Sequence, residues 1–84
     1  MLTLRNVAEV VAFAMRVDPK ELQRRSTSRR IVLARRVAAL VGLRTVPDAR
    51  LEEVSAAVGY RNRASIDDAR LDPEAVEVAD WIAA

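Results

Sequence analysis

The side chains that could do chemistry in this chain are almost all arginines. Of fourteen basic residues only Lys20 is a lysine, and the chain has neither histidine nor cysteine. Acid–base and nucleophilic catalysis rely mostly on histidine, cysteine or a lysine with a shifted pKa, and we expect Lys20 to lie in an exposed turn. No glycine-rich phosphate loop or cluster of metal ligands is present in the sequence. The sequence therefore predicts a protein that is not an enzyme and that uses no cofactor, metal or small-molecule substrate.

The basic residues are concentrated in one part of the chain. Residues 1–63 carry a net charge of +7 and residues 64–84 a net charge of −5, within a total of +2. The density is highest between Lys20 and Arg36, where Glu21 is the only acid. Such a cluster is typical of a protein that binds a polyanion. The alternative is a solvated basic face, and a salt titration of binding distinguishes the two.

The segment GYRNRASI, residues 59–66, holds a second set of candidates. Its glycine follows a helical pattern, and Asn62 can cap a helix that begins at Arg63. Arginine and asparagine match the purine edges of the major groove, and Ala64 can contact a thymine methyl group. Polar side chains at a helix start, including Ser65, also suit a phosphate. Two helices around such a turn predict a helix-turn-helix, the alternative being an ordinary helical hairpin.

Helices must position these segments, because apolar residues recur at three- and four-residue steps along most of the chain. With 51% apolar residues, two glycines and three prolines in 84 residues, the composition favours a small all-α bundle. Thr3, Asp18 and Asp72 are expected to cap helices. The expected helices are Leu4–Arg16, a short turn Pro19–Leu22, a long helix from a cap at Ser26 or Ser28 to Leu43, Pro47–Val58, Arg63–Leu71 and Glu74–Ala83. One domain is expected to span residues 1–84.

No segment of the sequence has the length and apolar character of a membrane span. The longest apolar stretch, Val7–Val17, is interrupted by Glu9 and Arg16, and it is shorter than the roughly 20 residues that cross a bilayer. It also lacks the features of a signal peptide. We therefore expect a cytoplasmic protein with no membrane partner, located in the host cytoplasm if a phage encodes it.

The sequence resembles the C-terminal DNA-binding domain of the bacterial replication initiator DnaA, a helix-turn-helix fold related to that of the Trp repressor. The resemblance lies in the order and spacing of DPKEL, RRSTSRR, IVLARRVAALVGL, LEEVSAAVG and YRNRASIDDA, and it covers about Thr3 to Ala69. Residues 1–71 are thus family-like, and an acidic C-terminal helix follows within residues 72–84. Because 84 residues cannot hold the ATPase domains of the initiator, we expect a standalone module of the kind that a phage or other mobile element encodes.

The resemblance implies contacts with double-stranded DNA. Either Arg25 or Arg29 would enter the minor groove from the basic loop, residues 24–30. Asn62, Arg63 and Ala64 replace the base-reading Asp-His-Thr of the family's Gly-Arg-Asp-His-Thr-Thr-Val segment, so the DNA sequence recognised does not transfer. Phosphate contacts are implied for Arg35, Arg36, Arg44 and Ser65. The full set of candidate DNA contacts is Arg25, Arg29, Arg35, Arg36, Arg44, Arg61, Asn62, Arg63, Ala64 and Ser65. We expect a regulator of replication or transcription.

The acidic end of the chain gives a second hypothesis, a protein-interaction module that keeps the fold and binds a host regulator or another copy of itself. Asp67 and Asp68 would oppose DNA if they faced its backbone. We expect them to point to solvent or to pair with Arg63 and Arg70 along the helix. Trp81 is expected to pack the last helix onto the core, the alternative being an anchor for a partner.

Overall fold

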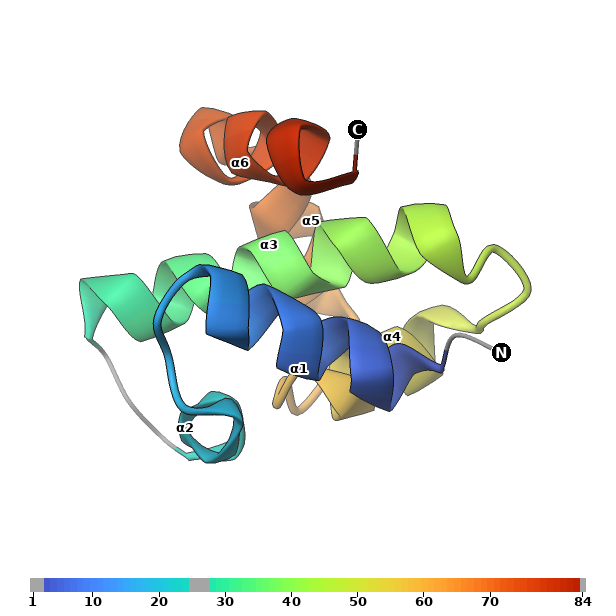
Figure 1. Ribbon diagram of the computed structural model, residues 1–84. Helices are drawn as coiled ribbons and strands as arrows, with labels where there is room; N and C mark the ends of the chain where they lie inside the picture. The colour runs from blue at the N-terminus through green and yellow to red at the C-terminus, as the bar shows by residue number, and fades with distance from the viewer. Residues whose placement is uncertain (1–2, 25–27, 84) are drawn as a thin grey trace.

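The computed structural model describes residues 3–24 and 28–83, and within these ranges the chain forms helices and no strand. This confirms the prediction of a small all-α bundle. None of the helices in these ranges is both long enough and apolar enough to cross a membrane. The helices are α1 (Leu4–Ala14), α2 (Pro19–Gln23), α3 (Arg29–Thr45), α4 (Leu51–Ala57), α5 (Ala64–Arg70) and α6 (Pro73–Ala83) (Figure 1).

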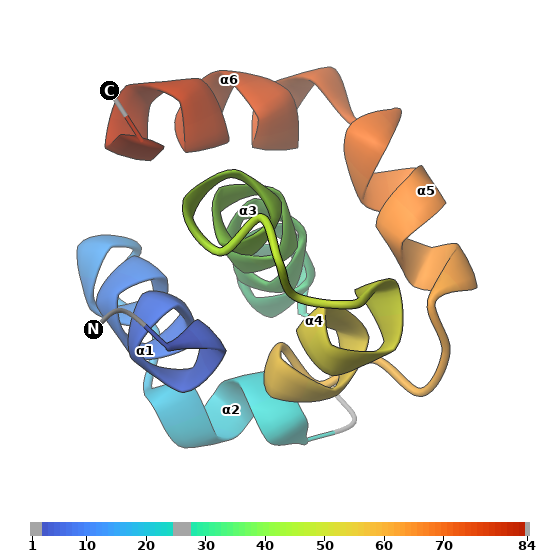
Figure 2. The ribbon, with the colours of Figure 1, turned by 90° about the vertical axis from the view of Figure 1, so that its right-hand side faces the viewer.

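Helix α3 lies at the centre of the bundle. It has its most extensive contacts with α6 and α1, and it also contacts α2, α4 and α5. Figure 2 looks along α3 and shows α1, α4, α5 and α6 arranged around it. Because every other helix contacts α3, this helix fixes the relative positions of the basic segment and of the turn before α5.

The core combines a few branched side chains with many alanines. Leu22, Val37, Val54 and Ile66 are almost completely buried, and each comes from a different helix. The buried alanines are Ala8, Ala12, Ala34, Ala38, Ala39, Ala69, Ala75 and Ala79. Large and small side chains on facing helices let the helices interdigitate. Truncating Leu22 or Ile66 to alanine would cost about 2–5 kcal/mol, a large share of the stability of so small a domain.

Side-chain caps begin the helices where the sequence predicts them. Thr3 and Asp18 accept hydrogen bonds from backbone N–H groups in the first turns of α1 and α2, at 3.2 and 2.9 Å. Asp72 accepts two from the first turn of α6, at 3.0 and 3.3 Å. Ser28 occupies the N-cap position of α3 but makes no side-chain capping hydrogen bond there, and Ser26 lies outside the described residues. The side chains of Thr3, Asp18 and Asp72 thus satisfy N–H groups that have no partner within their own helix.

Several helix ends differ from the predicted ones for local reasons. Helix α1 ends two residues early because Arg16 adopts a left-handed φ of 57°. Helix α3 continues to Thr45. Helix α4 begins at Leu51, since the side chain of Glu53 accepts a hydrogen bond from the backbone N–H of Arg50 at 3.0 Å and fixes the first turn there. Helix α5 is one residue shorter at each end than predicted.

Candidate nucleic-acid interface

The turn between α4 and α5 depends on Gly59. Its φ of 91° lies in the left-handed region that favours glycine. A Cβ atom at this position would lie 1.9 Å from the carbonyl oxygen of Leu22, so the backbone of the turn is packed directly against α2. Gln23 strengthens the contact by donating a hydrogen bond to the carbonyl of Ala57 at 3.0 Å. The glycine that was predicted to stop α4 therefore also holds the turn on α2.

Asn62 was predicted to cap α5, but Arg63 occupies the N-cap position and Asn62 lies one residue before it. The Oδ1 of Asn62 accepts a hydrogen bond from the backbone N–H of Ala64 at 3.0 Å. The amide oxygen is therefore engaged by the protein's own backbone. Bidentate pairing with adenine uses both the oxygen and the nitrogen of the amide, so it would require the hydrogen bond from Ala64 to break. The geometry favours a local role for Asn62 over base reading.

Arg61, Arg63 and Ala64 are exposed at the start of α5. The guanidinium of Arg63 lies 3.3 Å from the carboxylate of Glu52 on α4, and both side chains are largely exposed. An exposed ion pair of this kind contributes at most about 1 kcal/mol. Arg63 thus pairs with Glu52 instead of with Asp67, whose partner is an arginine of its own helix.

Ser65 faces a small depression between α3 and α5 that it shares with Arg36. The depression has a volume of about 150 Å³ and is lined by Val32, Arg35, Arg36, Tyr60, Ser65 and Asp68. Arg36, Tyr60 and Ser65 can donate hydrogen bonds to an oxyanion, whereas the carboxylate of Asp68 opposes one. Burial raises the pKa of Tyr60, which keeps its phenol protonated as a donor.

Arg36 also forms an ion pair with Asp72 at the start of α6. The two side chains meet at 2.8 Å and are 33% and 18% exposed. This hydrogen bond raises the pKa of Arg36 and lowers the pKa of Asp72, although partial burial works against both shifts. Arg36, a candidate phosphate contact on α3, is therefore already next to a carboxylate of the protein.

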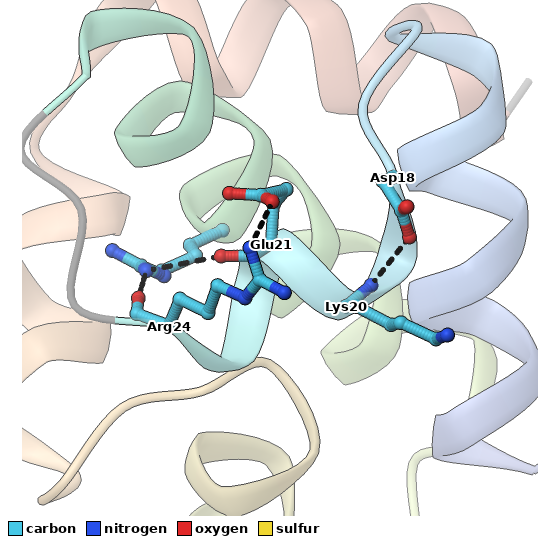
Figure 3. A network of polar contacts seen from close by, with 5 residues as sticks. Asp18, Lys20, Glu21 and Arg24 are labelled. Atoms are coloured by element: carbon cyan, nitrogen blue, oxygen red, sulfur yellow. Dashed lines mark hydrogen bonds and ion pairs between the residues drawn. The ribbon is translucent and has the colours of Figure 1, made fainter.

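Arg35 points into the protein, which corrects the prediction that it contacts phosphate. It is 8% exposed. Its Nε donates to the carbonyl of Leu22 at 2.7 Å, and its Nη2 donates to the carbonyls of Glu21 and Arg24. These carbonyls lie at and just beyond the end of α2, where the helix itself offers few donors. Figure 3 shows this end of α2, with the side chain of Arg24 next to that of Glu21. Arg35 thus holds α2 on α3.

The remaining arginine candidates lie at opposite ends of α3. Arg29 and Arg44 are 15 residues apart, which places them roughly 22 Å apart along the helix axis. Arg29 lies 3.6 Å from Glu74 and lines, together with Arg36, an open depression of about 440 Å³. Arg44 is paired with Asp80. Arg25, the other candidate for the minor groove, lies outside the described residues.

Trp81 is exposed, which corrects the expectation that it packs against the core. Its exposed fraction is 79%. Ala75 and Ala79 form the buried face of α6, and a residue two positions after Ala79 lies on the other side of a helix with 3.6 residues per turn. Glu77, one turn earlier, shares the exposed face with Trp81. The last helix therefore presents an aromatic ring and a carboxylate to solvent.

The local roles of Arg35, Glu52 and Tyr60 were not predicted from the sequence. A signal for Arg35 was present, because it follows Ile31 by four residues and precedes Ala38 by three, so it falls on the apolar face of the helix. Contacts of Glu52 and Tyr60 with arginines depend on how α4 and α5 pack on α3. Periodicity along one helix gives no signal for them.

No protein-family model matches the chain, and comparisons with curated proteins and with solved structures give no match either. Among the described residues, no group of three or more acidic side chains is arranged to hold a metal ion. The function must therefore be argued from the site geometry together with the order of motifs along the sequence.

Proposed function

We propose that the protein binds double-stranded DNA through α4, the turn and α5, with the start of α5 in the major groove. The observation that carries the proposal is the exposure of Arg61, Arg63 and Ala64 on a turn whose backbone is fixed by the contact between Gly59 and α2. Exposed side chains at the first residues of a second helix are the groups that contact bases in helix-turn-helix proteins. A turn held on the rest of the bundle keeps those groups in place before DNA arrives.

Base recognition in this proposal depends mainly on Arg63. Its guanidinium can donate two hydrogen bonds to guanine, which is worth about 1–3 kcal/mol of discrimination. The pair with Glu52 is exposed, so exchanging it for a base costs little. Ala64 supplies a methyl group that suits a thymine methyl. Asn62 keeps its hydrogen bond to the backbone of Ala64 and so supports the start of the helix.

Phosphate contacts come from Arg29, Arg36 and Ser65. Arg36 lines both the depression shared with Ser65 and the one shared with Arg29, so these groups can follow one DNA strand past the α3–α5 junction. Arg44, at the far end of α3, would meet a separate part of the backbone. Arg25, or Arg29 in place of its phosphate contact, enters the minor groove. Arg35 is not among the contacts, since its donors face carbonyls of α2.

The resemblance to the C-terminal DNA-binding domain of DnaA supports the same proposal. The motifs occur in the same order over about Thr3 to Ala69. Asn62, Arg63 and Ala64 differ from the family at its base-reading positions, so this chain recognises a sequence of its own. Its role is to regulate replication or transcription by occupying that sequence, as a phage-encoded module would.

Selection of binding sites from random duplexes, followed by a salt titration on the selected site, tests the proposal. The three proposed arginine–phosphate contacts predict a log–log salt slope of about −3. An enriched sequence with a slope of that size is the expected result. No enriched sequence together with a flat salt response would overturn the proposal.

The exposure of Trp81 favours a second candidate, a protein-interaction module that binds a host regulator or another copy of this chain. Tryptophan is enriched among residues that dominate protein interfaces, and here it lies beside Glu77 on the solvent face of α6. Capture of host proteins from nuclease-treated lysate, and sedimentation of the purified protein, would test the two partners. The Trp81→Ala variant should lose whichever interaction is found. Retention of that interaction would exclude Trp81 as the anchor.

A further inference from the structure

Three arginines that are proposed to contact phosphate already face carboxylates of the protein. The pairs are Arg29 with Glu74, Arg36 with Asp72 and Arg44 with Asp80. All three join α3 to the segment 72–80. We propose that this acidic segment competes with DNA phosphates for the arginines of α3, an inference that rests on the proposed DNA binding.

The three arginines lie on one side of α3. Arg36 follows Arg29 by seven residues and precedes Arg44 by eight, and each step is about two turns of helix. Helix α6 packs on α3 and runs beside it in Figure 2. The three ion pairs place these arginines on the side of α3 that faces the segment 72–80. The carboxylates are therefore spaced along the same stripe of α3 that phosphates would occupy.

The pair between Arg36 and Asp72 is the least exposed of the three. Its two side chains are mostly buried and meet at 2.8 Å, whereas Arg29 and Glu74 are 3.6 Å apart and more exposed. Asp72 is also fixed from the other side, because its Oδ1 accepts backbone hydrogen bonds at the start of α6 while its Oδ2 meets Arg36. The carboxylate is thus held in place before it meets the guanidinium.

A phosphate can reach this pair directly. The open depression of about 440 Å³ between α3, α5 and the start of α6 has Arg29 and Arg36 on one wall and Asp68, Asp72 and Glu74 on another. A phosphate that enters it meets both arginines and is repelled by the carboxylates. Binding then requires the arginines to exchange a carboxylate for a phosphate. The acidic segment lowers the affinity for any duplex without changing the bases that are read.

The variant Asp72→Asn tests the competition, because asparagine keeps the cap of α6 while the charge is lost. Its affinity for a random-sequence duplex should rise about three- to tenfold, as expected when a partly exposed ion pair no longer opposes binding. Glu77→Gln is the matched control, since it removes the same charge from the solvent face of the same helix. A double-mutant cycle separates the loss of the ion pair with Arg36 from the general effect of removing a negative charge. The gain in DNA affinity should disappear when Asp72→Asn is placed in an Arg36→Ala background.

A second cycle with Glu74→Gln and Arg29→Ala leaves the cap of α6 intact, and circular dichroism confirms that each variant is folded. The competition is overturned if Asp72→Asn and Glu74→Gln raise the affinity for DNA no more than Glu77→Gln does. It is also overturned if they raise the affinity equally when the partner arginine has been removed. Either result leaves the proposed DNA binding intact. If neither the wild type nor any variant binds duplexes in a salt-dependent way, the proposed function itself fails and the competition fails with it.

Discussion

The guanidinium of Arg36 and the carboxylate of Asp72 meet at 2.8 Å although 36 residues separate them along the chain. The same carboxylate accepts two backbone hydrogen bonds at the start of α6. One aspartate therefore begins α6 and ties it to α3. This double role holds the start of α6 on α3.

Acid should destabilise the protein partly through Asp72. The hydrogen bond from Arg36 lowers the pKa of Asp72 in the folded protein, so the unfolded chain binds the proton more tightly than the folded one. The stabilising contribution is present above the ordinary aspartate pKa and is lost as the pH falls below about 4, through the lowered folded pKa. Urea unfolding over this range should show a smaller loss of stability for Asp72→Asn than for the wild type. Equal losses would contradict the assignment.

Arg35→Met should destabilise the fold by about 2–4 kcal/mol. The substitution removes a charged donor and deprives the Leu22 carbonyl of its hydrogen bond in a buried place. Arg30→Met is the matched control, because Arg30 is an exposed residue of the same helix, and its effect should stay within about 0.5 kcal/mol. Urea unfolding followed by circular dichroism measures both. A comparable loss in the two variants would rule out the role given to Arg35.

The two glycines should differ in their tolerance of alanine. Gly59→Ala places a Cβ at 1.9 Å from the carbonyl oxygen of Leu22 and at a φ of 91°, so we expect a loss of at least about 2 kcal/mol. Gly42→Ala places its Cβ at 3.3 Å from the flexible side chain of Leu4, and alanine favours a helix interior by about 1 kcal/mol. Its stability should stay within about 1 kcal/mol of the wild type. Thermal unfolding distinguishes these outcomes.

Arg63→Ala and Arg36→Ala should weaken DNA binding in different ways. Loss of a base contact should reduce the preference for the selected site by about 1–3 kcal/mol while binding to random duplexes changes little. Loss of a phosphate contact should weaken all duplexes alike and make the salt slope shallower by about 1. Titrations of both variants on selected and random DNA provide the measurement. If both variants lost affinity equally on both duplexes, the division between base and phosphate contacts would be wrong.

The parts of the fold that were predictable from the sequence depend on residues that are close together along the chain. Thr3, Asp18 and Asp72 cap helices through backbone groups two or three residues away, and Gly59 ends α4 through its own φ. Apolar periodicity similarly identifies the buried faces, because it depends on helix geometry alone. The start of α4 was missed because the proline at position 47 resembles a helix start while Glu53 caps a later one.

The candidate site was less predictable, since it depends on how helices pack. A basic residue between apolar neighbours can face solvent or hold a neighbouring helix, and Arg35 holds α2 because α2 ends beside it. The resemblance assigned Arg35 and Arg36 the same role, but the two adjacent side chains point in different directions around the helix. Trp81 likewise lies outside the core because the alanines of α6 already fill the contact with α3.

The exposure of Trp81 makes it a built-in fluorescent probe of association. It is the only tryptophan in the chain, and 79% of its surface faces water in the folded protein. Its emission should therefore already resemble that of a hydrated indole, and unfolding should shift it little. A partner that covers the exposed face of α6 would remove water from the ring and move the emission to shorter wavelength.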